Sequence, residues 1–279
     1  MLYDYIRPEE RMLIDSSKKK GIKLKLHKSD DFFANALELS NKLEFEDVVL
    51  QRSISYFRSL HLTALLENRG INVINSSKIA TICGNKLMAT LILAKEKIAT
   101  PRTYIAFNIE STLKLLSKIG YPAIIKPVIG SWGRLVAPLK DPESTRAILE
   151  DRENMFPIYQ IYYIQEMVNR PPRDIRCFII GGEVVAAIYR YSSSNEWRTN
   201  TARGGRVENC EVTSELEDLS LKVVKTFGDG IFGVDLMESP DGLLVNEINF
   251  TTEFRNSVLA TGKDIPGLIL EYAIRRKKN

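Results

Sequence analysis

The chain has 279 residues, of which 44% are hydrophobic and 27% are charged, and its net charge of +4 is mild. A globular chain of this length buries roughly three quarters of its unfolded surface and divides into about two domains. No apolar run reaches the ~20 residues of a transmembrane helix, and three widely spaced cysteines exclude a disulfide framework or a zinc cluster, so a cytoplasmic enzyme without a signal peptide is expected.

The first 75 residues predict a small α/β unit in which short apolar strands alternate with helices. The helix expected over 8–21 has proline in its first turn and glycine at its end, as helix termini favour. Because strands alternate with helices, a parallel sheet is expected. The expected strands lie at 1–3, 48–50 and 71–74, a second helix includes 60–67, and 75–77 caps a third.

From about residue 101, strands occur in clusters with helices between them, which is typical of α+β organisation. Gly181 and Gly182 predict a two-residue hairpin turn, and 240–242 predicts a second one. The expected strands lie at 123–128, 161–168, 176–180, 184–191, 233–237 and 243–248, and the expected helices at 113–119 and 215–227.

Acidic and amide side chains on the last predicted hairpin form the strongest candidate site. Glu247 and Asn249 are two residues apart on one strand and therefore point to one face, where Asp235 of the neighbouring strand can join them. Two carboxylates and an amide oxygen suit Mg²⁺, which takes its other ligands from water and substrate phosphates. The alternative is two hairpin acids facing solvent, but their apolar neighbours predict a partly buried sheet, in which an uncompensated carboxylate pair is costly.

A glycine-containing loop after the 123–128 strand is a candidate phosphate site. Lys126 lies in the strand, and glycine lets backbone N–H groups approach phosphate oxygens closely, while Arg134 could bind phosphate through two hydrogen bonds. The spacing matches neither a P-loop nor a dinucleotide-binding fingerprint, so an ordinary hairpin turn is the alternative. The loop residues are Gly130, Ser131, Trp132, Gly133 and Arg134.

Three further segments are weaker candidates when taken alone. Lys86, at the start of a predicted helix, could reach a phosphate, although a surface lysine is the simpler interpretation. The 165–168 segment follows a strand and offers backbone groups that could contact an adenine edge. The polar 200–206 segment carries Arg203 and a glycine pair, and is either a flexible surface loop or an anion clamp over an active site.

The order of these motifs resembles that of the ATP-grasp superfamily over essentially the whole chain. Within it, the sequence is similar to the branch that contains ribosomal-protein glutamate ligases and the LysX and ArgX ligases, which use the amino-group carrier protein LysW. The motifs are Lys86, Lys126-Pro127 with its glycine loop, Gln165-Glu166, Asp174-Ile175-Arg176, the 200–205 Asn-x-x-x-Gly-Gly run, Asp235, the 246–249 Asn-Glu-x-Asn run and 252–257.

This resemblance implies a fold of mixed α/β and α+β type. An N-terminal pre-ATP-grasp α/β domain is expected over 1–80. Two ATP-binding α+β lobes follow, a central ATP-grasp lobe over 81–168 and a C-terminal ATP-grasp lobe over 169–279, which carries the Mg²⁺ and substrate site. ATP is expected to lie between the two lobes.

The resemblance also implies a role for each candidate residue. Asp235, Glu247 and Asn249 are expected to hold two Mg²⁺ ions, and Arg203 with Asn200 to act in catalysis, Arg203 by stabilising the tetrahedral intermediate. The expected ATP-binding residues are Lys86, Lys126, Gly130, Ser131, Trp132, Gly133, Arg134, Gln165, Glu166, Val168, Asp174, Arg176 and Asn200. The expected substrate-binding residues are Arg190, Thr201, Ala202, Glu253, Phe254, Arg255, Asn256 and Ser257.

The implied reaction joins the α-amino group of 2-aminoadipate to the γ-carboxyl group of the C-terminal glutamate of LysW through an acyl phosphate, in lysine biosynthesis. LysW-type carriers are small acidic proteins, which suits a chain of positive net charge, and relatives form homodimers or homotetramers. In this branch an Asn-Ser pair at 256–257 accompanies aminoadipate, whereas Gly-Phe accompanies glutamate. One methylene group is worth only about 1–3 kcal/mol, so a glutamate-accepting or bifunctional ligase stays open.

Other functions remain as alternatives. One is a ligase that adds glutamate to the C-terminus of another protein, with the same ATP machinery. Another is a nucleotide-binding regulatory protein without turnover, against which the complete Mg²⁺ set argues. A Rossmann oxidoreductase is excluded because the glycine-rich fingerprint is missing. No motif indicates nucleic-acid binding, and no membrane association is expected.

Overall fold

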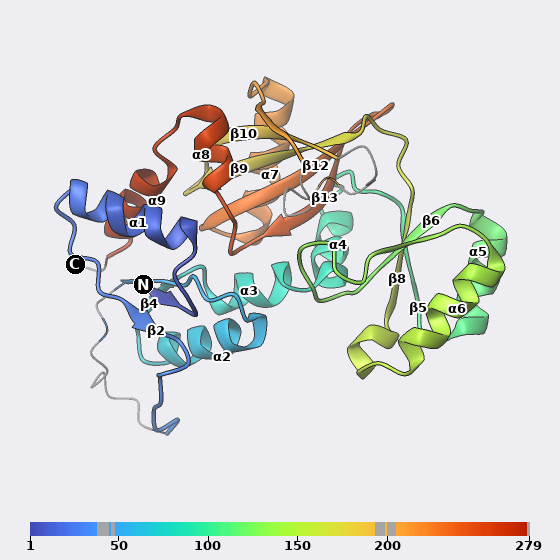
Figure 1. Ribbon diagram of the computed structural model, residues 1–279, viewed down its shortest axis with the longest axis horizontal. Helices are drawn as coiled ribbons and strands as arrows, with labels where there is room; N and C mark the ends of the chain where they lie inside the picture. The colour runs from blue at the N-terminus through green and yellow to red at the C-terminus, as the bar shows by residue number, and fades with distance from the viewer. Residues whose placement is uncertain (38–44, 46–47, 193–198, 200–204, 278–279) are drawn as a thin grey trace.

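The computed structural model describes residues 1–37, 45, 48–192, 199 and 205–277. Its N-terminal part is the α/β unit that the sequence predicts (Figure 1). Strands β1 and β2 pair in parallel, as do β3 and β4, and a parallel bridge from Leu2 to Gln51 joins the two pairs. The elements are β1 (Leu2–Tyr3), α1 (Pro8–Lys19), β2 (His27–Lys28), β3 (Val48–Leu50), α2 (Tyr56–Glu67), β4 (Asn72–Ile74) and α3 (Ser77–Cys83).

The central part is an antiparallel sheet in the strand order β5-β8-β6-β7, with two helices packed against it. Leu116 of α5 and Leu149 of α6 are fully buried in this core. The edge strand β7 contains a central proline, which lacks the N–H of a ladder residue. The elements are α4 (Lys86–Lys95), β5 (Thr103–Ala106), α5 (Ile109–Ile119), β6 (Ala123–Lys126), β7 (Ala137–Leu139), α6 (Pro142–Glu153), the 3₁₀ turn η1 (Pro157–Gln160) and β8 (Tyr162–Glu166).

The C-terminal part is a second antiparallel sheet, in the order β11-β10-β9-β12-β13. Helix α7 packs on one face through Val223 and Phe227, and α9 packs on the other through Ile265 and Ile269. The elements are β9 (Arg173–Ile180), β10 (Glu183–Tyr191), β11 (Val207–Asn209), α7 (Ser214–Phe227), β12 (Ile231–Ser239), β13 (Gly242–Asn249), α8 (Arg255–Thr261) and α9 (Ile265–Arg275).

One hydrophobic core joins the first and the last segments of the chain. Helix α1 lies beside α9 at the left of Figure 1. Met1 and Leu13 share a buried cluster with Phe254 and Ile269. The N-terminal unit therefore packs directly on the sheet that carries the predicted metal ligands.

Asn75 fixes the link between the N-terminal and C-terminal parts. Its amide nitrogen donates to the carbonyl oxygens of Ile231 and Phe250, each at 2.7 Å, and its amide oxygen accepts from the Ile231 N–H at 2.8 Å. Gly230 permits this approach, because a Cβ atom there would lie 2.3 Å from the Asn75 oxygen. These bonds hold the segment after β13 against the N-terminal unit.

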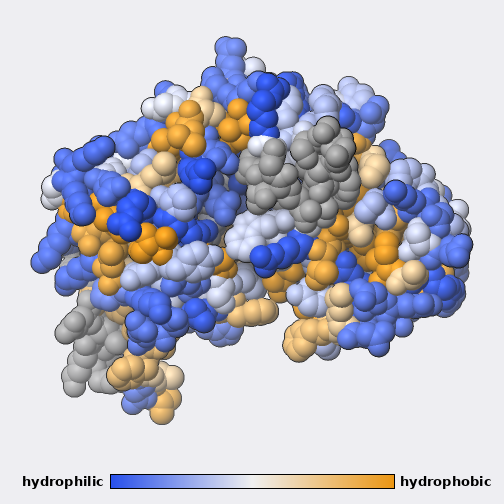
Figure 2. All heavy atoms as spheres, in the orientation of Figure 1, coloured by the Kyte–Doolittle hydropathy of each residue, from blue (hydrophilic) through white to orange (hydrophobic). Residues whose placement is uncertain are grey.

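The surface in Figure 2 is mostly hydrophilic, with hydrophobic side chains gathered in separate patches. Among the described residues, every helix is too short or too polar to cross a bilayer.

Candidate functional site

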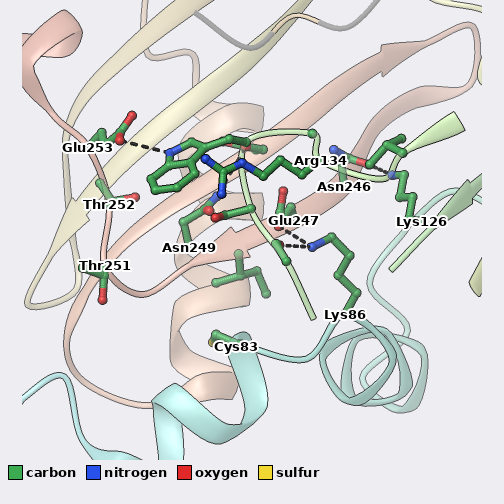
Figure 3. A pocket seen from close by; sticks show the side chains of 18 of the residues that line it. Cys83, Lys86, Lys126, Arg134, Asn246, Glu247, Asn249, Thr251, Thr252 and Glu253 are labelled. Atoms are coloured by element: carbon green, nitrogen blue, oxygen red, sulfur yellow. Dashed lines mark hydrogen bonds and ion pairs between the residues drawn. The ribbon is translucent and has the colours of Figure 1, made fainter. Parts of the chain in front are cut away.

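A pocket lies where the three parts of the chain meet. The central sheet contributes Lys126 and the loop that follows it, which we call the glycine loop (residues 127–136), and α4 contributes Lys86. The C-terminal sheet contributes Asp235, Glu247 and Asn249 (Figure 3). The N-terminal unit contributes Arg7, Ser53 and Tyr56. The C-terminal part also contributes Asp174, Arg176, Arg190 and 250–253.

Two lysine side chains enter this pocket from the central part. Lys126 ends β6 and is buried, and its Nζ donates to the side-chain oxygens of Gln165 and, at 2.9 Å, Asn246. Lys86 begins α4, and its Nζ donates to the Gly130 carbonyl at 2.7 Å and lies 3.0 Å from Glu247 Oε1. Two ammonium groups therefore face the acidic strand β13, as a phosphate-binding site requires.

The charge of Lys126 is sensitive to pH. Burial lowers the pKa of its ammonium group from 10.5 to about 8; the Glu247 carboxylate opposes this shift and the Lys86 cation adds to it. Lys126 is therefore charged below pH 8 and neutral above it. We expect nucleotide affinity to be steady below pH 8 and to fall as pH rises further, because the neutral amine attracts phosphate weakly.

Binding of a phosphate raises the lysine pKa, so nucleotide binding at pH 8–9 is expected to take up protons. Calorimetric titration of nucleotide at that pH, in two buffers with different heats of ionisation, measures this uptake. Equal binding heats in the two buffers would show that Lys126 does not titrate with the ligand.

The register of the last hairpin brings the predicted metal ligands together. Asp235 pairs with Glu247, whereas Leu236 pairs with Val245, so Asn246 is an extra residue in a β-bulge. Asn249 lies beside Asp235, with its amide nitrogen 3.4 Å from Asp235 Oδ2. The bulge lets Asn246 reach Lys126 while its neighbour Glu247 faces Lys86.

Asp235 also belongs to a buried ion-pair network. Arg176 binds it through two hydrogen bonds, at 2.7 and 2.8 Å, and Arg190 Nη2 lies 2.9 Å from its Oδ2. Arg190 in turn binds Asp174 through two bonds of 2.7 Å, and Thr199 donates to Asp174. Burial raises the pKa of Asp235, but the two guanidinium groups outweigh burial and hold it below its usual range.

These residues fit a Mg²⁺ site. A carboxylate has about four acceptor positions. In the part of the chain that the structure describes, Asp235 Oδ1 accepts from Arg176 Nε, while the other donors lie at Oδ2. Among the described residues, no three acidic, histidine or cysteine side chains converge as a metal cage. Two carboxylates and an amide oxygen match the coordination preference of Mg²⁺, which binds few protein ligands and takes its other ligands from water and phosphate.

The glycine loop crosses the pocket to the C-terminal part. Trp132 has a φ of 58°, in the left-handed region that non-glycine residues rarely adopt. Its indole N–H donates to Glu253 Oε1 at 3.1 Å, and the Arg134 guanidinium carbon lies 4.8 Å from the centre of its ring system. The loop predicted from its glycines therefore covers the site, and Figure 3 shows Arg134 directed over Glu247 and Asn249.

The 165–168 segment lies apart from the lining of this pocket. Gln165 is buried and binds Lys126, Thr103 and Tyr163. Glu166 accepts from the Arg102 N–H at 2.8 Å, and Val168 lies beyond the end of β8. The contact of Gln165, Glu166 and Val168 with adenine stays a prediction.

The predicted substrate residues divide into three groups. Glu253 and Arg190 line the pocket. Phe254 and Ser257 are buried in the protein, Asn256 is half-buried, and exposed Arg255 begins α8. Thr201 and Ala202 lie outside the described residues, as do the predicted catalytic residues Asn200 and Arg203.

Sequence reasoning missed several lining residues. Asn246 stands inside the Asn-Glu-x-Asn run, and the bulge that turns it toward Lys126 leaves no mark in the sequence pattern. Arg7, Ser53 and Arg170 belong to no motif. The proline that follows Arg7 predicted the start of α1 but gave no indication that Arg7 faces a pocket.

Comparison with known proteins identifies the family of this chain. The sequence-family model of the RimK-like ATP-grasp domain matches residues 83–273, and the family model of the LysX preATP-grasp domain matches residues 1–82. The solved RimK domain protein ATP-grasp from Sphaerobacter thermophilus superposes with a TM-score of 0.81, at 21% identity, over 98% of this chain and 99% of its own. That similarity supports the ATP-grasp fold.

Two groups of curated relatives span nearly the whole chain. The alpha-aminoadipate–LysW ligase LysX of Saccharolobus solfataricus is 40% identical over 96% of this chain and 97% of its own length. The glutamate–LysW ligase ArgX of Sulfolobus acidocaldarius is 34% identical over 98% and 96%. Together with the lysines and acids of the pocket, these matches show that the chain belongs to the RimK-like ATP-grasp family, with a LysX preATP-grasp domain, and is an ATP-dependent carboxylate–amine ligase.

Proposed function

We propose that the chain joins the α-amino group of 2-aminoadipate to the C-terminal glutamate of a LysW-type carrier protein, as a step of lysine biosynthesis. An ATP-dependent reaction is supported by one observation: two lysines, Lys86 and Lys126, line the same pocket as Asp235, Glu247 and Asn249. The choice of substrate is supported by the higher identity to the LysX relatives, 40% against 34% for ArgX.

The reaction has two steps, for which the protein supplies mainly position and charge. In the first, an oxygen of the carrier's γ-carboxylate attacks the γ-phosphorus of ATP, and ADP leaves. In the second, the substrate amine attacks the acyl carbon, and phosphate leaves as the amide forms. Lys86 and Lys126 bind the phosphates in both steps.

Mg²⁺ neutralises phosphate charge when it is bound, and we propose two ions held by Asp235, Glu247 and Asn249. The glycine loop lies where it can exclude water, since Trp132 reaches across to Glu253. Exclusion of water protects an acyl phosphate from hydrolysis.

The substrate preference is proposed to depend on Asn256 and Ser257. Both stand in the first turn of α8, directly after the pocket-lining segment that ends at Glu253. Small polar side chains at these positions leave room for the longer acid, whereas the Gly-Phe pair of glutamate-specific relatives would fill it. The positive net charge of +4 would favour encounter with an acidic carrier.

A glutamate-accepting ligase is the second candidate, favoured by the 34% identity to ArgX over 98% of the chain. Release of ADP in the presence of Mg²⁺-ATP and a LysW-type carrier, compared between aminoadipate and glutamate, separates the two.

We expect a preference for aminoadipate of about tenfold or more in kcat/KM, since one methylene group is worth about 1–3 kcal/mol. The double variant N256G/S257F is expected to reverse the preference. Comparable rates with both acids would indicate a bifunctional ligase, and activity with glutamate alone would contradict the proposal.

A further inference from the structure

The substrate amine arrives as an ammonium ion, and the acidic residues that line the pocket differ in their capacity to receive it. Asp174 and Asp235 bind Arg190 and Arg176 through short hydrogen bonds. Glu247 is paired with Lys86 at 3.0 Å. Among the described lining residues, these three carboxylates are therefore already neutralised by cations.

Glu253, the remaining described acid of the lining, is different. One of its oxygens, Oε1, accepts from the Trp132 indole N–H at 3.1 Å. Among the described residues, Arg7 is its cationic partner, in a long ion pair in which Nη1 lies 3.7 Å from that same oxygen without a hydrogen bond. The Glu253 side chain is 38% exposed, so a ligand in the pocket can approach it.

Arg7 is committed elsewhere. Its Nε and Nη2 each donate to Glu10 at 2.8 Å, and Glu10 also accepts from Arg52 at 2.9 Å. Glu9, the neighbour of Glu10, is buried as well and accepts from the Arg255 N–H. The carboxylates of Glu9, Glu10 and Glu253 act on the guanidinium groups of Arg7 and Arg52, so within this group of five side chains the negative charges outnumber the positive ones by one, which suits a cationic ligand.

The position of Glu253 also suits the second step of the reaction. In Figure 3, Lys86 and Lys126 lie on one side of the pocket and Glu253 lies on the other, with Glu247 and Asn249 between them. A nucleophile held at Glu253 would therefore approach the phosphate site from the side opposite the lysines.

We infer that Glu253 binds the ammonium group of the incoming amino acid and accepts its proton, and that Trp132 positions the Glu253 carboxylate for this. The inference rests on the proposed ligase reaction. One proton moves from the ammonium nitrogen to a Glu253 oxygen, and this frees the nitrogen lone pair. The lone pair then forms the C–N bond with the acyl carbon, the bond from that carbon to the phosphate oxygen breaks, and the second nitrogen proton leaves with the phosphate.

The test separates the two half-reactions of E253Q. Hydroxylamine is a neutral nucleophile at pH 7 and traps the acyl phosphate as a hydroxamate without an ammonium-binding group. With Mg²⁺-ATP and a LysW-type carrier, hydroxamate formation by E253Q is expected to stay near the wild-type rate. Ligation of the cationic amino acid is expected to fall about a hundredfold in kcat/KM, the usual effect of removing a proton acceptor.

Two further variants complete the design. W132F keeps an aromatic ring in the glycine loop but removes the N–H donor, and its ratio of ligation to hydroxamate formation is expected to fall about tenfold. E271Q removes an exposed carboxylate of α9 that binds Lys20, and should leave both readouts unchanged.

Equal loss of hydroxamate and ligation in E253Q would overturn the inference, because Glu253 would then act in the first step. Unchanged ligation in E253Q would overturn it as well. Absence of hydroxamate in the wild-type protein would instead reject the proposed function, and with it the inference.

Discussion

The variant D174A is expected to lose about 3–5 kcal/mol of unfolding free energy, the usual cost of removing one partner of a buried ion pair. Asp174 is only 4% exposed, and it accepts hydrogen bonds from Arg190 Nε and Nη2 and from the Thr199 hydroxyl. Without it, the carboxylate that Arg190 retains among the described residues is Asp235, which Arg176 also binds. Urea denaturation followed by circular dichroism measures the loss.

The matched control is E238A, one strand away. Glu238 binds Arg173 through two bonds of 2.7 Å, the same geometry, but its side chain is 25% exposed. Solvent can replace this interaction, so a loss of about 1 kcal/mol or less is expected. Equal losses in the two variants would contradict the view that burial sets the cost.

The variant K126M is expected to lose about tenfold to a hundredfold in nucleotide affinity, because a charge-assisted hydrogen bond to phosphate contributes about 1.5–3 kcal/mol. Turnover should fall further, by about 10²–10³, since the ammonium group is aimed at charge that develops during phosphoryl transfer. Titration with Mg²⁺-ATP and ADP release in the presence of carrier measure the two effects.

K140M, which removes an exposed lysine just after β7, should change neither quantity. K126M is expected to lose about 1–3 kcal/mol of unfolding free energy, because the Gln165 and Asn246 oxygens lose the Lys126 donor although methionine fills a similar volume. Wild-type nucleotide affinity in K126M would show that Lys126 does not contact the phosphates.

Elements with a strong local signal could be predicted from the sequence. Proline at the start and glycine at the end defined α1 to within two residues, and the Gly181-Gly182 turn placed β9 and β10 correctly. Short edge elements were missed: β5 and β7 have three or four residues each, and their pairing is set by distant strands. Local patterns carry no information about such partners.

The site could be predicted where its residues alternate along a strand. Glu247 and Asn249 face the pocket as their spacing requires, and Asp235 joins them across the hairpin. The arginine partners of Asp235 and the contact between Trp132 and Glu253 depend on how separate parts of the chain pack, so no spacing rule could reveal them.

The core that contains both Met1 and Ile269 has a consequence for how the protein forms in the cell. During synthesis the N-terminal unit leaves the ribosome long before α9, which covers it, has been made. The apolar surface of this unit is therefore expected to stay exposed until α9 has been synthesised. Exposed apolar surface makes a nascent chain prone to aggregation, which chaperones counteract. The two matching family models meet between residues 82 and 83, whereas the hydrophobic core continues across that division.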